Sequence, residues 1–77
     1  EHLNLRVQNY DGVDVIFKIM TTTPLRKLME AYCIRLSLNL KSIVFLFDGK
    51  ALQPDFSSAA YGIINNDIID VVKQHKV

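Results

Sequence analysis

The chain has 77 residues, 49% hydrophobic and 22% charged, which is typical of one small globular domain and too short for two. Its net charge is only +1, and among the basic residues only Arg26 and Lys27 are adjacent, which argues against nucleic acid as a partner. No apolar run approaches the roughly 20 residues that span a bilayer, so we expect no membrane partner.

An alternating hairpin opens the chain. Leu3, Leu5 and Val7 alternate with polar residues, which is the period-two pattern of a half-buried strand. Turn residues follow from Asn9 to Gly12. Because their Asp-Gly pair tolerates the positive φ angles of a tight hairpin, the chain should return as a second strand over Val13 to Met20, antiparallel to the first.

The second strand carries two apolar residues, Ile16 and Met20, on the face where polar residues are expected. Scattered surface hydrophobes would explain them without any function. An exposed docking strip would give them one. The pattern alone favours the first explanation.

A helix is predicted after the Thr-rich turn, because Thr23 can cap its free amides and Pro24 supplies a helical φ at the first position. Apolar residues then recur at three- and four-residue steps and form one buried stripe. They are Leu25, Leu28, Met29, Tyr32 and Leu36. Cys33 lies near this stripe and is predicted to be a small buried hydrophobe.

The second half of the chain predicts three further strands. A connector over residues 37–42 leads to an apolar strand over 43–47, the hairpin signal Asp48-Gly49 and a short strand over 50–52. A loop, a brief helical turn ending at Gly62 and a turn over 65–67 precede a last strand over 68–72. That strand is nearly continuously apolar, so we expect it at the centre of the sheet. One helix across a mixed sheet would bury these faces together, which makes the fold class α+β.

This element order resembles the β-grasp, and the residues are similar to the SUMO branch of the ubiquitin-like modifiers. The similarity runs through Val15 to Leu28 (VIFKIMTTTPLRKL), Met29 to Cys33, Phe45 to Gly49, Gly62, and Asp67 to Val71. The Tyr-Cys pair and the Phe-Leu-Phe-Asp-Gly hairpin are its most specific parts. The resemblance covers nearly the whole chain and implies a sheet of four to five strands with one main helix packed across it.

The resemblance implies a groove for SUMO-interaction motifs, which are short hydrophobic peptides that add as an extended strand to the second strand, a sheet edge beside the helix. Backbone groups of such an edge bond the peptide, and side chains select it. Carried over by position, the groove is lined by Ile16, Phe17, Lys18, Ile19, Leu28, Tyr32 and Arg35. Lys18 and Arg35 would face acidic residues that flank the peptide. Alternatively, the apolar side chains only fill the core and the two charges are only solvated.

A second surface implied by the resemblance contacts the conjugating enzyme through the Phe-Asp-Gly hairpin and the turn before the last strand. The matching positions are Arg6, Asp48, Gly49, Gly62 and Asp67. Where that family shows a run of acidic residues, this chain has Ile63 to Asn66. The lost negative charge should weaken steering toward a basic partner and thereby this contact.

A conjugated modifier ends in Gly-Gly, because residues without side chains can thread into narrow enzyme sites. This chain ends in Gln74-His75-Lys76-Val77. Either the natural chain continues into such a tail and is attached to lysines of target proteins, or this is an unconjugated interaction module within a larger protein. Val77 stands about where the first glycine would come, which favours the second alternative. Both imply a monomer in the nucleus and cytoplasm that meets SUMO-pathway proteins.

Groups for catalysis or metal binding are sparse. Cys33 is the only cysteine, which fits a reducing compartment, and the pattern places it on the core side of a helix without a neighbouring base. His2 and His75 are far apart in the chain, and the glycines are isolated at turns, so neither a metal site nor a phosphate loop is indicated. We expect no enzyme activity, no cofactor and no metal. A sulfur-carrier β-grasp protein and a purely structural ubiquitin-like domain are the other possibilities.

Overall fold

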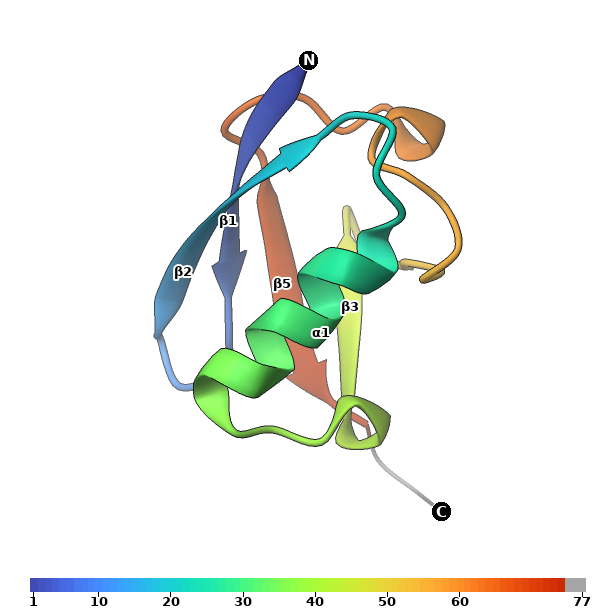
Figure 1. Ribbon diagram of the computed structural model, residues 1–77. Coiled ribbons are helices and arrows are strands. Elements are labelled where there is room, and N and C mark those ends of the chain that lie inside the picture. The colour runs from blue at the N-terminus through green and yellow to red at the C-terminus, as the bar shows by residue number, and fades with distance from the viewer. Residues whose placement is uncertain (75–77) are drawn as a thin grey trace.

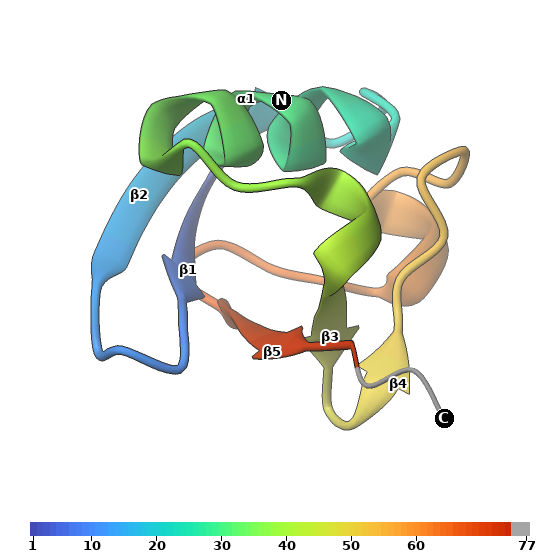
Figure 2. The ribbon, with the colours of Figure 1, turned by 90° about the horizontal axis from the view of Figure 1, so that it is seen from below.

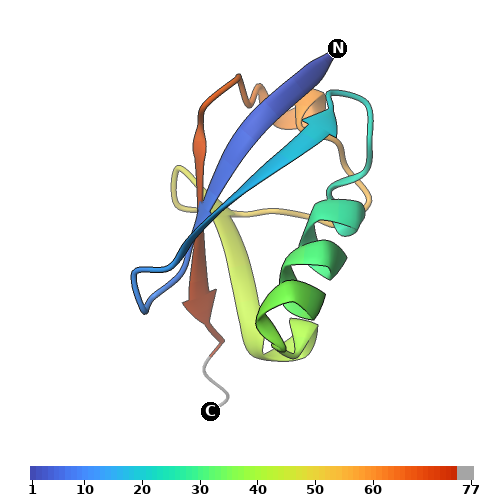
Figure 3. The same ribbon diagram turned by 60° about the vertical axis from the view of Figure 1, so that its left-hand side comes forward.

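The computed structural model describes residues 1–74, which form one helix packed on a five-stranded sheet (Figure 1). The elements are β1 (His2–Gln8), β2 (Asp14–Met20), α1 (Leu25–Leu36), η1 (Leu40–Ser42), β3 (Ile43–Phe47), β4 (Lys50–Ala51), η2 (Ala59–Tyr61) and β5 (Ile68–Lys73). Figures 2 and 3 show α1 lying against one face of the sheet. The predicted α+β class and β-grasp arrangement are therefore confirmed. Within residues 1–74, no helix is both long enough and apolar enough to cross a membrane.

The strands are ordered β2-β1-β5-β3-β4, with β1 and β5 parallel and the other neighbours antiparallel. The predicted central position of β5 is confirmed, and β2 and β4 form the two edges. β5 includes Lys73, and the Gln74 N–H donates to the Ser42 carbonyl at 2.9 Å. The chain end over residues 73–77 is expected to fray, as domain termini commonly do, but at its first two residues this strand and this bond tie the backbone to the fold. Residues 75–77 lie outside the described residues.

Only one face of the sheet is covered. Ile69 and Val71 of β5 are buried beneath α1, whereas their neighbours Ile68 and Val72 are exposed on the opposite face. β5 is therefore central in the sheet but buried on one face only, although its nearly continuous apolar run is typical of a strand that is buried on both faces. The predicted helix stripe is buried except for Leu36, which is partly exposed, and Cys33 is buried as predicted.

An aromatic chain links the helix to the sheet. The Tyr32 ring of α1 lies 6.3 Å from the Phe17 ring of β2 and 5.5 Å from the Phe45 ring of β3, measured between centroids. Such tilted and edge-on pairs stabilise beyond their buried area. Tyr32 is fully buried, and its hydroxyl has no hydrogen-bond partner of normal geometry among the described residues.

The start of α1 differs from the prediction. Pro24 occupies the cap position with ψ 138°, and no side chain, Thr23 included, caps the helix. The first amides instead donate to backbone carbonyls of the loop after β4: Leu25 to Phe56 at 2.8 Å and Arg26 to Pro54 at 2.9 Å. Capping by a distant loop satisfies the same orphan donors, but it cannot be recognised from local sequence.

The two Asp-Gly turns are not alike. Asp48 and Gly49 both have positive φ, 51° and 79°, as the predicted tight hairpin requires. In the β1–β2 turn only Gly12 has positive φ. There the Asn9 side chain accepts bonds from the amides of Asp11 and Val13, so the turn is longer than the two-residue form that the sequence predicts.

The turn before β5 is fastened to β1. The Asn4 N–H donates to Asn65 Oδ1 at 2.7 Å, and the Asn4 carbonyl accepts from the Asn66 N–H at 2.7 Å. Asp67 closes the turn, since its Oδ2 accepts from the Ile64 N–H at 2.8 Å. The Asn65 side chain therefore holds the turn within the segment 63–66, which has no acidic residue.

We predict that Asn65→Ala lowers the free energy of unfolding by about 0.5–1.5 kcal/mol, because it removes the acceptor for the Asn4 amide. Urea unfolding followed by circular dichroism measures the change. Ile64→Ala is the control, since Ile64 is 65% exposed in the same turn and only its backbone is bonded. Equal stabilities of Asn65→Ala and the parent would contradict the proposed fastening.

We also predict that Tyr32→Phe unfolds no more easily than the parent, and is up to about 1–3 kcal/mol more stable, because it removes a buried hydroxyl without a partner. Tyr61→Phe is the matched control. The Tyr61 hydroxyl accepts from the Gln53 N–H at 2.7 Å, so its loss should destabilise the fold. A larger loss at Tyr32 than at Tyr61 would show that the Tyr32 hydroxyl is bonded after all.

Alkaline pH supplies a further readout for Tyr32. Burial raises the pKa of Tyr32 above its usual 10.0, an effect that the nearby Asn9 side chain partly opposes. The folded state therefore holds the phenolic proton more tightly than the unfolded state does, and stability from this group is present below pH 10 and lost above it. Tyr32→Phe should lose less stability than the parent as the pH is raised through this range.

Candidate functional site

The backbone of β2 is unpaired along one side. The bonds from Asn9 N–H to the Val13 carbonyl and from Thr21 N–H to the Glu1 carbonyl mark the hydrogen-bonded pairs with β1. Such pairs recur every second residue, so the odd-numbered residues of β2 bond to β1. The amides and carbonyls of Asp14, Ile16 and Lys18 point away from the sheet. We call this row of outward-directed groups, together with the side chains of 14–20, the β2 edge.

The β2 edge has two chemically different faces. Phe17 and Ile19 are partly buried against the core on the side of α1. Ile16, 62% exposed, shares the outer face with Lys18 and Met20. The alternation of the strand explains the difference, because α1 covers one face alone. A strand paired to β2 would therefore meet apolar surface on both sides of the sheet.

The predicted groove residues fall into two sets. Phe17, Ile19 and the exposed Ile16 and Lys18 belong to the β2 edge itself. Leu28, 2% exposed, and Tyr32, 0% exposed, lie within the core and offer little surface, and the Tyr32 ring packs against Phe17. The hollows that include Ile16 and Asp14 open on the outer face of β2, so this site is a strand edge flanked by side chains and does not depend on a pocket.

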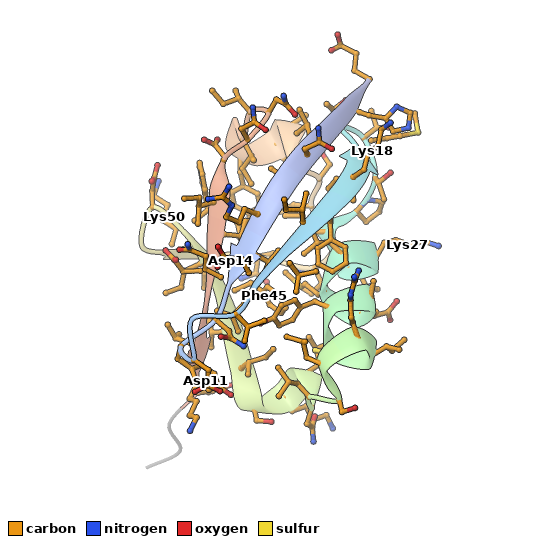
Figure 4. The ribbon with its side chains drawn as sticks, turned by 90° about the vertical axis from the view of Figure 1, so that its left-hand side faces the viewer. Asp11, Asp14, Lys18, Lys27, Phe45 and Lys50 are labelled. Atoms are coloured by element: carbon orange, nitrogen blue, oxygen red, sulfur yellow. The ribbon has the colours of Figure 1, made fainter. Side chains whose placement is uncertain are left out.

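Two of the predicted groove residues, Lys18 and Arg35, are positively charged and come from different elements. Lys18 lies on the outer face of β2, and Arg35 is exposed in the last turn of α1 (Figure 4 labels Lys18). Neither has a salt-bridge partner within residues 1–74, where the ion pair found is Arg26 with Asp55. Since Lys18 and Arg35 are on opposite sides of the sheet, they would meet alternate residues of an added strand.

The second predicted surface is largely brought together. Asp48 and Asp67 line one shallow hollow, and the Arg6 N–H donates to the Asp67 carbonyl at 3.1 Å. Gly49 is beside them in the β3–β4 turn. Gly62 is elsewhere: it ends η2, where its amide bonds to Ala59, and it does not line this hollow.

Sequence reasoning missed Asp70 as a member of this surface. Asp70 is exposed on the outer face of β5 and lines the same hollow as Asp48 and Asp67. Strand alternation could have revealed it, because Ile69 and Val71 on either side point into the core. Three carboxylates thus line this hollow, although the turn over 63–66 has none. Within residues 1–74, no three Asp, Glu, Cys or His side chains are placed to hold a metal ion.

Comparison with known proteins supports the fold and the resemblance. The family model described as "Ubiquitin-2 like Rad60 SUMO-like" matches residues 3–72. Small ubiquitin-related modifier 2 of Xenopus tropicalis is 43% identical over 74 residues, which are 96% of this chain and 78% of that protein. Small ubiquitin-related modifier 2 of Arabidopsis thaliana is 42% identical over 71 residues, which are 92% of this chain and 69% of that protein.

A solved structure agrees at the level of the fold. The ubiquitin-like domain of Plasmodium falciparum Dsk2 superposes with a TM-score of 0.85, covering 96% of this chain and all of that one, at 16% sequence identity. That identity supports the fold alone. The family match over most of the chain, with relatives above 40% identity, is the stronger finding. The chain belongs to the SUMO-like family of ubiquitin-like proteins.

Proposed function

We propose that this domain is a recognition module that binds SUMO-interaction motifs by strand addition at the β2 edge. The observation that carries the proposal is the position of β2: it pairs with β1 on one side, and its other side lies at the margin of the sheet. An extended peptide can satisfy the outward amides and carbonyls of Asp14, Ile16 and Lys18 whatever its sequence. The domain acts by binding and catalyses nothing.

Side chains beside the edge provide the selectivity. Phe17 and Ile19 are only partly buried, so aliphatic residues of a peptide can cover them on the side of α1. Lys18 and Arg35 favour acidic residues next to that aliphatic core, since neither charge is neutralised by another residue within 1–74. One peptide occupies one edge, so the binding form is a monomer.

Conjugation is the second candidate function. It is favoured by the hollow lined by Asp48, Asp67 and Asp70, which returns negative charge to the surface expected to meet the conjugating enzyme. In this alternative the domain is activated and attached to lysines of target proteins through a Gly-Gly tail. For both candidate functions, we propose that the domain acts in the nucleus and cytoplasm, where it meets SUMO-pathway proteins.

The first test is titration of the ¹⁵N-labelled domain with a peptide that has four aliphatic residues and an acidic flank. We expect a micromolar dissociation constant, which corresponds to a binding free energy on the order of 8 kcal/mol. The largest amide shifts should lie along Asp14–Met20 and near Arg35. The control peptide carries prolines in its aliphatic core, which prevents strand pairing. Shifts confined to Ile43–Leu52, with none on β2, would refute binding at this edge.

The second test concerns charge. Lys18→Glu should weaken binding of the acidic peptide about 3- to 10-fold, because an exposed ion pair is replaced by repulsion. Lys27→Glu makes the same charge change on α1, where Figure 4 shows Lys27 directed away from β2, and should have little effect. Raising the salt concentration should narrow the difference between the two variants. Equal dissociation constants for both at low salt would remove Lys18 from the site.

A further inference from the structure

The outer face of β2 carries opposite charges at equal distances from an exposed apolar residue. Asp14 and Lys18 lie two residues before and after Ile16, and all three are on the same face (Figure 4 labels both charges). Ile16 is the most exposed large apolar residue of the strand. This order of side chains, acidic, apolar, basic, is complementary to itself when read in the opposite direction.

Hydrogen-bond geometry permits one self-pairing that uses this complementarity. If two β2 strands run antiparallel about a two-fold axis at Ile16, the Ile16 residues face each other and Asp14 of one copy faces Lys18 of the other. The outward amides and carbonyls belong to the even-numbered residues, so these facing residues are the hydrogen-bonded pairs of the new ladder. Directly opposite side chains on one face contact each other.

Neighbouring registers lose the charge pairing. An axis at Phe17 would place Asp14 opposite Met20, and an axis at Val15 would place Asp14 opposite Ile16, although both keep the same backbone bonds. Only the axis at Ile16 joins both charge pairs. On the side of α1 it also sets Val15 of one copy against the partly buried Phe17 of the other.

We propose that a second copy of this chain is a partner of the β2 edge, joined through an antiparallel β2–β2 ladder centred on Ile16. The opposite margin of the sheet does not offer an equivalent surface, because β4 is only two residues long. Pairing is reversible and depends on concentration, and it occupies the same backbone groups that a peptide would use. Self-association therefore blocks peptide binding at the β2 edge. Dilution dissociates the dimer and makes the edge accessible again.

Charge-exchange variants provide the test, and no peptide is needed, so its result is independent of the proposed function. At low salt, sedimentation equilibrium of the parent should show the average mass rising from 8.8 kDa toward twice that value as the concentration approaches about 1 mM. Asp14→Lys and Lys18→Asp each place like charges opposite one another in both pairs. Each should raise the dimer dissociation constant at least about tenfold.

Mixing the two single variants is the decisive measurement. In a mixed dimer, both introduced charges face residues of opposite sign, so an equimolar mixture should associate like the parent. The double variant Asp14→Lys/Lys18→Asp should also associate, since it only exchanges the members of each pair. Lys27→Asp, which changes charge on α1, should dimerise like the parent.

Two results would overturn the proposal. One is a parent chain that stays at the monomer mass up to about 1 mM. The other is a mixture of the single variants that associates no better than each variant alone, with circular dichroism confirming that all are folded. Recovery of association in the mixture identifies the register, because no other alignment of two β2 strands brings these two positions together in both pairs.

Discussion

The packing of Tyr32 between Phe17 and Phe45 decides the form of the site. These three rings join α1 to an edge strand and to a strand of the other half of the sheet. Because the Phe17 ring packs against Tyr32 of α1, β2 lies beside the helix. The margin of β2 that does not pair with β1 is left open to solvent. The buried hydroxyl of Tyr32, which has no regular partner among the described residues, is the cost of placing a large aromatic ring there.

A single helix leaves the other face of the sheet open, and this explains the exposed apolar residues. Arg6 of β1 is paired with Ile16 of β2 on one side and with Ile68 of β5 on the other. Ile16, which was ambiguous in the sequence, thus forms a row with Arg6 and Ile68 across the outer face, with the cation at its centre. Beyond that row lie the carboxylates of the hollow at Asp48, Asp67 and Asp70. The outer face therefore combines apolar and charged groups across three strands, while the β2 edge offers backbone groups.

The turns and the helix start differ in how well the sequence pattern predicted their conformation. The Asp48-Gly49 hairpin followed from two residues that tolerate positive φ, and it formed as expected. The other Asp-Gly turn is longer, because the Asn9 side chain accepts bonds from two of its amides. The helix begins without its predicted Thr23 cap, because its first amides donate to carbonyls of a distant loop. Bonds between residues far apart in the chain leave no periodic trace in the sequence, so the capping of the helix could not be predicted, whereas the Asn9 bonds are local.

The element order, the strand alternation, the helix stripe and the family resemblance could all be predicted from the sequence, because each depends on spacing within a few residues or on motifs that can be compared directly. The sequence also named most residues of both candidate surfaces, but neither Asp14 of the β2 edge nor Asp70 of the hollow. The packing of the chain was needed to show that Leu28 and Tyr32 are core whereas Ile16 and Lys18 are exposed. It also separates Gly62 from the hollow at Asp48 and leaves the backbone groups of the even-numbered residues of β2 directed outward. The physical reason is that burial and hydrogen-bond direction are set by which strands become neighbours, and β1 pairs with β5 across about sixty residues of chain.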